Sequence, residues 1–309
     1  FLSAASWAGF GLHPRGNFEA FIQAKSADKW LEVHPGRHEE WFYLEYGMQL
    51  QKRFFDFYLK DEKNGWDKEP RVWLNLRRPF SNEFKLRKEN EWPLERTKWT
   101  KLFIDPSQNG SLSWKKNPKS AEINFSSNSR GISILSDPLK SETEITGPIV
   151  AKLFVSSSTE DCDIFITLQA FSETGKEVYF QGTVDPRTPL AQGWLRASHR
   201  KLDKNKSLFW RPYHSHDEKQ MLLPNEIYEL DIEIWPQSII LPKGYQIGIN
   251  ISGQDFDRPG ESVGDYMPCR GSGPFLHNDP FDRPKEIFSG ETTIYSGENH
   301  TSYILLPII

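Results

Sequence analysis

The hydrophobic pattern of this chain changes its period near Asp67, and that change limits the folds available to it. Before this point, strand-like runs at residues 1–5 and 30–33 alternate with helical-period segments at residues 18–25 and 41–59. The order strand, helix, strand, helix is typical of a parallel α/β sheet. The pattern therefore predicts that residues 1–69 form the C-terminal part of a parallel α/β domain.

From residue 70 onward, short runs alternate with period two and are separated by turn signals such as Pro242-Lys243-Gly244. Many short strands without intervening helices are typical of a β-sandwich or barrel. We therefore expect residues 70–309 to form one all-β domain. The expected strands are 71–76, 101–104, 132–135, 149–155, 164–171, 178–181, 228–235, 245–251 and 302–307.

Composition argues against several classes of partner. The net charge is −4 with both signs interspersed, and no basic patch with interleaved aromatic residues predicts nucleic-acid binding. No apolar run reaches membrane-spanning length, so no membrane partner is expected. The two cysteines have no metal-ligand spacing, and we expect no cofactor or metal. A cytoplasmic location is the default expectation, while five glycosylation sequons leave secretion open: Asn109, Asn124, Asn205, Asn250 and Asn299.

The candidate catalytic residues lie between the second predicted strand and the second predicted helix. Residues 34–38 read His-Pro-Gly-Arg-His, which places two histidines in a turn after the carboxyl end of a strand. Open α/β sheets place their active sites at this edge. We favour His38 over His34 as a general base, because His34 directly follows the strand whereas His38 has the reach to face a nucleophile on another strand.

The matching serine and acid are not evident in this sequence. A G-x-S-x-G motif occurs at residues 260–264, but it lacks the strand before it and the helix after it that a nucleophile elbow requires. In α/β-hydrolases the chain order is Ser, acid, His, so the end of such a domain would keep the acid and His loops. The loop expected to hold the acid, residues 7–11, contains no carboxylate, and Glu39 and Glu40 are local substitutes.

Other polar clusters have structural interpretations. Asp161 and Asp163 precede a predicted strand, and we expect their carboxylates to bind loop amides rather than a metal or a carbohydrate. Asp255 and Asp257 are interpreted in the same way, and His199 as part of an internal hydrogen-bonding corner. The aromatic loop at residues 208–213 is expected to line a substrate pocket or to pack the seam between the two domains.

Several motifs are spread over nearly the whole chain. They are Trp7 with residues 11–16, residues 29–34 leading to 51–60, residues 64–66, residues 147–165, residues 193–200, and residues 241–245 with 255–256. Together they resemble the C-terminal part of the CocE/NonD hydrolases, the group of cocaine esterase, α-amino acid ester hydrolases and X-Pro dipeptidyl-peptidases. The resemblance implies an α/β-hydrolase segment at residues 1–69. It also implies a galactose-binding-like jelly-roll sandwich at 70–309, of the X-Pro dipeptidyl-peptidase C-terminal type.

The resemblance also implies a serine hydrolase that cleaves an ester or amide bond of a small acyl substrate through a Ser-His-acid mechanism. His38 takes the position of the family's histidine, with His34 as the second choice, and Gly9 stands where the family carries its acid. The nucleophile and oxyanion hole are then expected before Phe1, in an N-terminal hydrolase fragment that partners this chain.

Two alternatives stay open at this point. In the first, Gly9 marks a non-catalytic relative whose jelly roll serves binding or homo-oligomerisation. In the second, the protein is a free carbohydrate-binding jelly roll, which leaves the hydrolase-like residues 1–66 without a use. We also expect the helix ending near Leu59 to lie at the seam between the domains, because it is aromatic on more than one face.

Overall fold

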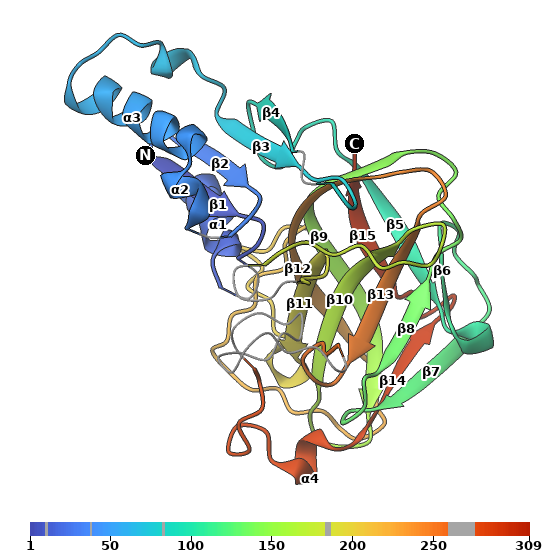
Figure 1. The fold of residues 1–309 in the computed structure, drawn as a ribbon. Coiled ribbons are helices and arrows are strands. Elements are labelled where there is room, and N and C mark those ends of the chain that lie inside the picture. Colours follow the sequence, from blue (N-terminus) through green and yellow to red (C-terminus); the bar gives the residue numbers. More distant parts are fainter. Residues whose placement is uncertain (10–11, 38, 82–83, 183–186, 259–275) are drawn as a thin grey trace.

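The computed structural model describes residues 1–9, 12–37, 39–81, 84–182, 187–258 and 276–309. A small sheet with helices lies beside a larger pair of packed sheets (Figure 1). The elements of the smaller part are β1 (Leu2–Ser6), α1 (Pro14–Gln23), β2 (Trp30–His34), α2 (Glu40–Tyr43), α3 (Glu45–Leu59), the 3₁₀ turn η1 (Trp66–Lys68), β3 (Val72–Leu76) and β4 (Lys85–Glu89).

The smaller sheet has the order β1-β2-β3-β4, with β1, β2 and β3 parallel and β4 antiparallel to β3. All five residues of β2 are buried, because helices cover both of its faces. Leu31 and Val33 face the core under α1, which includes Phe18. Trp30 faces the opposite side and packs with Phe54 of α3. This double coverage explains why β2 reads as a continuous buried run.

The division between the sheets differs from the boundary predicted at residue 70. Val72–Leu76, assigned above to the all-β domain, pair in parallel with β2 and are buried throughout. Lys85–Glu89 pair with them, so the smaller sheet reaches Glu89. A short, mostly apolar run is compatible with a central strand of either sheet type, and periodicity alone does not reveal its partner.

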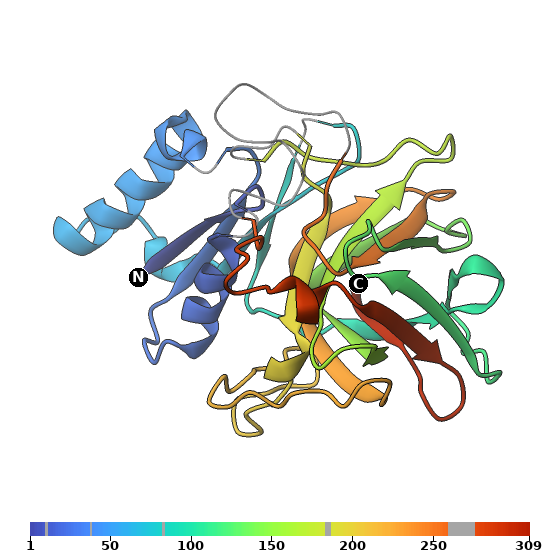
Figure 2. The same ribbon diagram turned by 90° about the horizontal axis from the view of Figure 1, so that it is seen from below.

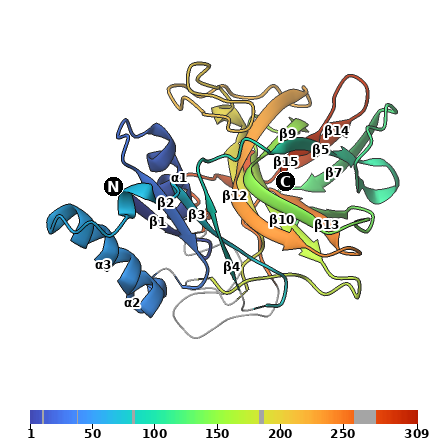
Figure 3. The ribbon, with the colours of Figure 1, turned by 90° about the horizontal axis from the view of Figure 1, so that it is seen from above.

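The larger part contains two sheets, of order β11-β10-β13-β8 and β6-β5-β15-β9-β14-β7, with β12 paired to β9. Their layering can be followed in Figures 2 and 3. Both sheets contribute fully buried residues to one core, including Ile166, Ile249, Leu153 and Ile304. The strands are β5 (Lys98–Asp105), β6 (Ser111–Ser113), β7 (Ala121–Ser126), β8 (Ile132–Leu135), β9 (Thr143–Ser157), β10 (Asp163–Phe171), β11 (Ala191–Arg196), β12 (Tyr228–Leu241), β13 (Gln246–Ser252), β14 (Glu291–Ser296) and β15 (Tyr303–Ile308).

Most of the strands predicted after residue 98 are present, but the prediction of a strand at residues 178–181 is wrong. Residues 178–181 form no strand and take part only through isolated bridges, such as the one between Phe180 and Thr188. The remaining helical elements of this part, within the described residues, are the short turns η2 (Ser107–Asn109), η3 (Ala197–His199) and α4 (Lys285–Phe288). In the part of the chain that the structure describes, no helix is both long and apolar enough to span a membrane.

The seam between the two parts is formed by α1, β3 and β12, and not by α3 as expected. Arg15 of α1 lies 2.9 Å from Glu233 of β12. The backbone nitrogen of Ile240 donates to the carbonyl oxygen of Arg77 at 3.0 Å. α3 covers the outer face of the small sheet, away from the sandwich (Figure 1), and Leu59 is 75% exposed. Its aromatic residues pack on Trp30 and the neighbouring Trp66 instead.

Candidate active site

His34 is the last residue of β2, at the carboxyl edge of the small sheet. Strand geometry points the side chains of residues two apart to the same face, which brings Glu32 beside it. His34 Nδ1 lies 2.8 Å from Glu32 Oε2, and both residues are buried. The pair faces the side of the sheet covered by α2 and α3.

The carboxylate of Glu32 is held by further donors. The hydroxyl of Tyr46 and the side-chain amide of Asn75 both donate to its second oxygen, each at 3.3 Å. Burial, and then the negative charge of Glu32, raise the pKa of the Tyr46 phenol, which keeps that hydroxyl protonated as a donor. A carboxylate in this setting accepts the Nδ1 proton of His34, so the lone pair of the neutral imidazole resides on Nε2.

The Nε2 atom of His34 is buried and has no hydrogen-bond partner among the described residues. The indole of Trp41 stacks on the imidazole, with ring centroids 5.6 Å apart and planes inclined by 20°. A cavity of about 550 Å³ adjoins this histidine. Its lining is largely apolar and includes Leu2, Ala4, Trp41, Phe42, Tyr43, Phe54 and Phe55. An oriented imidazole beside an apolar cavity is an arrangement that can remove a proton from an incoming nucleophile.

Only some of the predicted site residues lie at the candidate site in the structure. His38 and the G-x-S-x-G motif at residues 260–264 lie outside the described residues. His34 ends the strand rather than starting the loop. Glu40, proposed as a substitute acid, accepts a hydrogen bond from the backbone nitrogen of Arg37 at 3.4 Å instead of contacting His34. Glu39 lines the cavity.

Glu32 is the residue of this candidate site that the sequence did not predict. The search for an acid followed the chain order of α/β-hydrolases and looked in the loop after the preceding strand. The available signal was the spacing Glu-x-His within a predicted strand, since period-two alternation places both side chains on one face.

The other polar clusters are structural among the described residues. Asp161 accepts hydrogen bonds from the backbone nitrogens of Cys162 and Ser198, both at 2.9 Å, which confirms its predicted role. Asp163 instead forms an ion pair with Arg196 at 2.9 Å. Within the described ranges, no group of His, Cys, Asp and Glu is arranged to hold a metal ion.

The aromatic loop at residues 208–213 packs at the seam and also borders a cavity. Phe209 and Trp210 lie against Trp99 of β5, with ring centroids 5.3 and 6.2 Å from it. Arg211 forms an ion pair with Glu19 of α1. The next residues, Pro212 and Tyr213, line a second cavity on the sandwich beside its seam with α1.

Comparison with known proteins identifies relatives among peptidases and hydrolases. Residues 64–305 match the family described as the X-Pro dipeptidyl-peptidase C-terminal non-catalytic domain. A CocE/NonD family hydrolase from Staphylococcus aureus is 30% identical with a TM-score of 0.87, covering 100% of this chain and 54% of that one. An aminopeptidase from a Thaumarchaeota archaeon has the same fold at 15% identity, with a TM-score of 0.70 and coverage of 100% and 55%.

A curated relative has a matching name. The cocaine esterase of a Rhodococcus species is 26% identical over 176 residues, which are 57% of this chain and 24% of that protein. This chain thus spans about half the length of the solved relatives, and the aligned part is about a quarter of the curated one.

Proposed function

Because the chain belongs to the X-Pro dipeptidyl-peptidase C-terminal family, and is similar along its whole length to a CocE/NonD hydrolase, we propose that it is the C-terminal portion of a serine hydrolase. The family membership expected from the sequence motifs is confirmed by these matches. In this proposal the small sheet is the end of an α/β-hydrolase domain. The sandwich, of jelly-roll type, is the non-catalytic part. The substrate class is a small ester or amide of a carboxylic acid.

The Glu32–His34 pair is the observation that carries this proposal. A serine hydroxyl, supplied by a hydrolase region outside these residues, would transfer its proton to Nε2 of His34 while its oxygen attacks the acyl carbon. Glu32 stabilises the imidazolium that forms, and the Nδ1–H bond of 2.8 Å keeps the ring oriented. The proton then passes to the leaving group, and water hydrolyses the acyl-enzyme by the same route.

The exposed surface around the cavity supports a partner region on this side. Phe42 is 58% exposed and Tyr43 is 71% exposed, next to the cavity they line. Contiguous exposed apolar surface of this kind marks an interface. An N-terminal hydrolase region that carries the serine and the oxyanion donors would cover it.

A non-catalytic relative remains the second candidate, since Gly9 supplies no carboxylate at the position where related hydrolases carry their acid. The two candidates differ in what they require of Glu32. If Glu32 has taken over the role of the acid, its carboxylate is needed for turnover. If the protein is non-catalytic, the pair only fills and orders the end of β2.

The test is ester hydrolysis by the complete hydrolase, with p-nitrophenyl acetate as substrate. We expect His34→Ala to lower kcat by about a thousandfold or more, and Glu32→Gln by a similar order, with KM little changed. His199→Ala, on the outer surface of the sandwich, is the control and should retain full activity. A larger loss with His38→Ala than with His34→Ala would transfer the role of base to His38. Absence of turnover in the parent protein would favour the non-catalytic candidate.

A further inference from the structure

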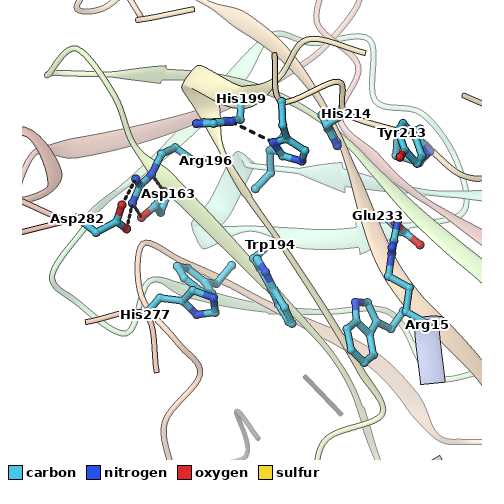
Figure 4. Close-up of a pocket in the computed structure, with 15 residues that line it drawn as sticks. Arg15, Asp163, Trp194, Arg196, His199, Tyr213, His214, Glu233, His277 and Asp282 are labelled. Atoms are coloured by element: carbon cyan, nitrogen blue, oxygen red, sulfur yellow. Dashed lines mark hydrogen bonds and ion pairs between the residues drawn. The ribbon is translucent and has the colours of Figure 1, made fainter. Parts of the chain in front are cut away.

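A second cavity, of about 560 Å³, lies on the sandwich beside its seam with α1 and shares no lining residue with the cavity beside His34 (Figure 4). Its volume falls within the range of about 300–1,000 Å³ typical of small-molecule sites. Strands β10, β11 and β12 form its floor, α1 contributes Arg15, and the segments around residues 212–216 and 277–282 form its rim. Side chains on strands are held more rigidly than side chains on loops, so the floor of this cavity is preformed.

Aromatic rings make up the floor. The indoles of Trp194 and Trp235 lie with centroids 5.8 Å apart and planes inclined by 37°. Figure 4 shows Trp194 between His277 and Arg15, and the His277 ring lies 5.5 Å from it. Close approach of β11 to β12 requires Gly193, because a Cβ there would lie 2.1 Å from the carbonyl oxygen of Glu233. These contacts bring two indoles together on one concave surface.

The charged groups of the cavity are already paired with one another. Arg196 binds Asp163 at 2.9 Å and Asp282 at 2.9 Å, and Arg15 binds Glu233 at 2.9 Å. Among the lining residues that the structure describes, no arginine is therefore left over to bind a phosphate or a carboxylate of a ligand. The outer edges of these ion pairs still offer hydrogen-bond donors and acceptors, which suit a neutral polar ligand.

One uncharged hydrogen-bonding group in the lining, on His214, lacks a partner among the described residues. His214 Nε2 is buried and has none, while the backbone of Asp231 hydrogen-bonds the same imidazole. Burial lowers the pKa of His214 to about 4, so the ring is neutral near pH 7. A neutral imidazole whose other nitrogen is engaged presents one further hydrogen-bonding site to a ligand.

From these features we propose that the cavity binds a neutral saccharide. The apolar C–H face of a sugar ring packs on an indole, while its hydroxyl groups hydrogen-bond in the ring plane to groups such as His214, the Arg196–Asp282 pair and the Arg15–Glu233 pair. A purely apolar ligand would leave these polar edges without partners, and an anion would find no unpaired arginine among the described lining residues. The proposal does not depend on the proposed hydrolase chemistry, since this cavity shares no lining residue with the cavity beside His34.

The test is saturation-transfer and titration NMR on the full chain, with maltose, lactose and chitobiose as probes and sodium benzoate as an anionic comparison. We expect saturable binding of at least one saccharide. Trp194→Ala should weaken it by about tenfold or more, which is the effect of losing one well-packed aromatic contact. His214→Phe keeps the ring shape, removes the imidazole nitrogens, and should weaken binding by about fivefold.

Trp114→Ala is the matched control, because Trp114 is an exposed tryptophan of the same sandwich outside the cavity. Circular dichroism of each variant establishes that it is folded, and the His214→Phe variant tests the site if Trp194→Ala does not fold. The proposal is overturned if none of the three saccharides binds saturably. Unchanged affinity in a folded Trp194→Ala or His214→Phe variant would also overturn it, as would displacement of the saccharide by benzoate.

Discussion

At the scale of single residues, the buried carboxyl group of Glu32 is surrounded by three hydrogen-bonding groups. His34, Tyr46 and Asn75 all reach its two oxygens. A buried polar group without such partners would be destabilising, so these contacts are what allow Glu32 to lie inside the sheet. The same bonds restrict the rotation of the His34 ring. Its free nitrogen is thereby held in a fixed direction before any substrate arrives, which is the condition for an effective general base.

His214 should make the free energy of unfolding depend on pH. Burial lowers its pKa in the folded protein from 6.5 to about 4, with a further contribution from the neighbouring His216. Between these two pH values the unfolded chain binds a proton that the folded chain does not, so stability falls as the pH decreases. We expect urea unfolding to show that the parent loses about 1–2 kcal/mol more than His214→Gln between pH 7 and about pH 5.

His199→Gln serves as the control for this prediction. His199 Nδ1 lies 3.0 Å from His216 Nδ1 in the same cluster, and burial also lowers its pKa, but the shift is smaller than that of His214. Its replacement should change the pH dependence of unfolding much less. Equal pH dependence in the parent and in His214→Gln would show that folding does not lower the pKa of His214.

The sequence was sufficient to locate the histidine loop but not the partner of the histidine. Strand and helix periods placed residues 34–38 at the carboxyl edge of the sheet, where His34 is found. The acid was sought by analogy with chain order, which depends on where other strands end. The contact between Glu32 and His34 depends only on the pleat of one strand, yet a carboxylate inside a buried strand conflicts with ordinary burial preferences.

At the scale of elements, the strands of the sandwich were easier to predict than the elements of the seam. Strand-like runs such as 149–155 and 164–171 lie within β9 and β10, because each is rich in apolar and β-branched residues over a strand's length. β3 and α3 were assigned to the wrong neighbours, since each has apolar residues that several surfaces could cover. Which surface does so is decided by contacts distant in sequence, such as the one between Arg77 and Ser238.

Substitutions of Arg77 at this seam can separate the contribution of its packing to stability from the contribution of its charge. It is 1% exposed, and its guanidinium lies 4.3 Å from the Phe180 ring and 5.4 Å from the Trp7 ring. Burial lowers its pKa to about 9, so the charge itself is costly. We expect Arg77→Ala to reduce the free energy of unfolding by about 3 kcal/mol or more, because it leaves a cavity at the seam.

Arg77→Met is the matched comparison, since it retains the length of the side chain and removes the desolvated charge. Its stability in urea should lie within about 1.5 kcal/mol of the parent. If the methionine variant is as unstable as the alanine variant, the charge and its hydrogen bond to Gln237 stabilise the seam rather than the packing.

At the scale of the whole molecule, the two parts differ in how completely their apolar residues are buried. The sandwich encloses one core between two sheets, whereas β1 is an edge strand of the smaller sheet and α2 and α3 leave apolar residues in contact with solvent. The exposed residues of this face are Phe42, Tyr43, Leu44, Met48 and Phe55. An edge strand next to an apolar surface favours association with another chain or region.

This asymmetry leads to a prediction for the 309-residue chain by itself. We expect it to self-associate through the face formed by α2 and α3, and the double variant Phe42→Ser with Tyr43→Ser to reduce this association at equal concentration in light scattering. Phe281→Ser is the control, because Phe281 is a 96% exposed aromatic residue outside that face. Adding the proposed serine-bearing region should abolish the self-association of the parent by covering the same residues. A chain that stays monomeric at every concentration, and gains nothing from that region, would show that the face needs no cover and would favour the non-catalytic candidate.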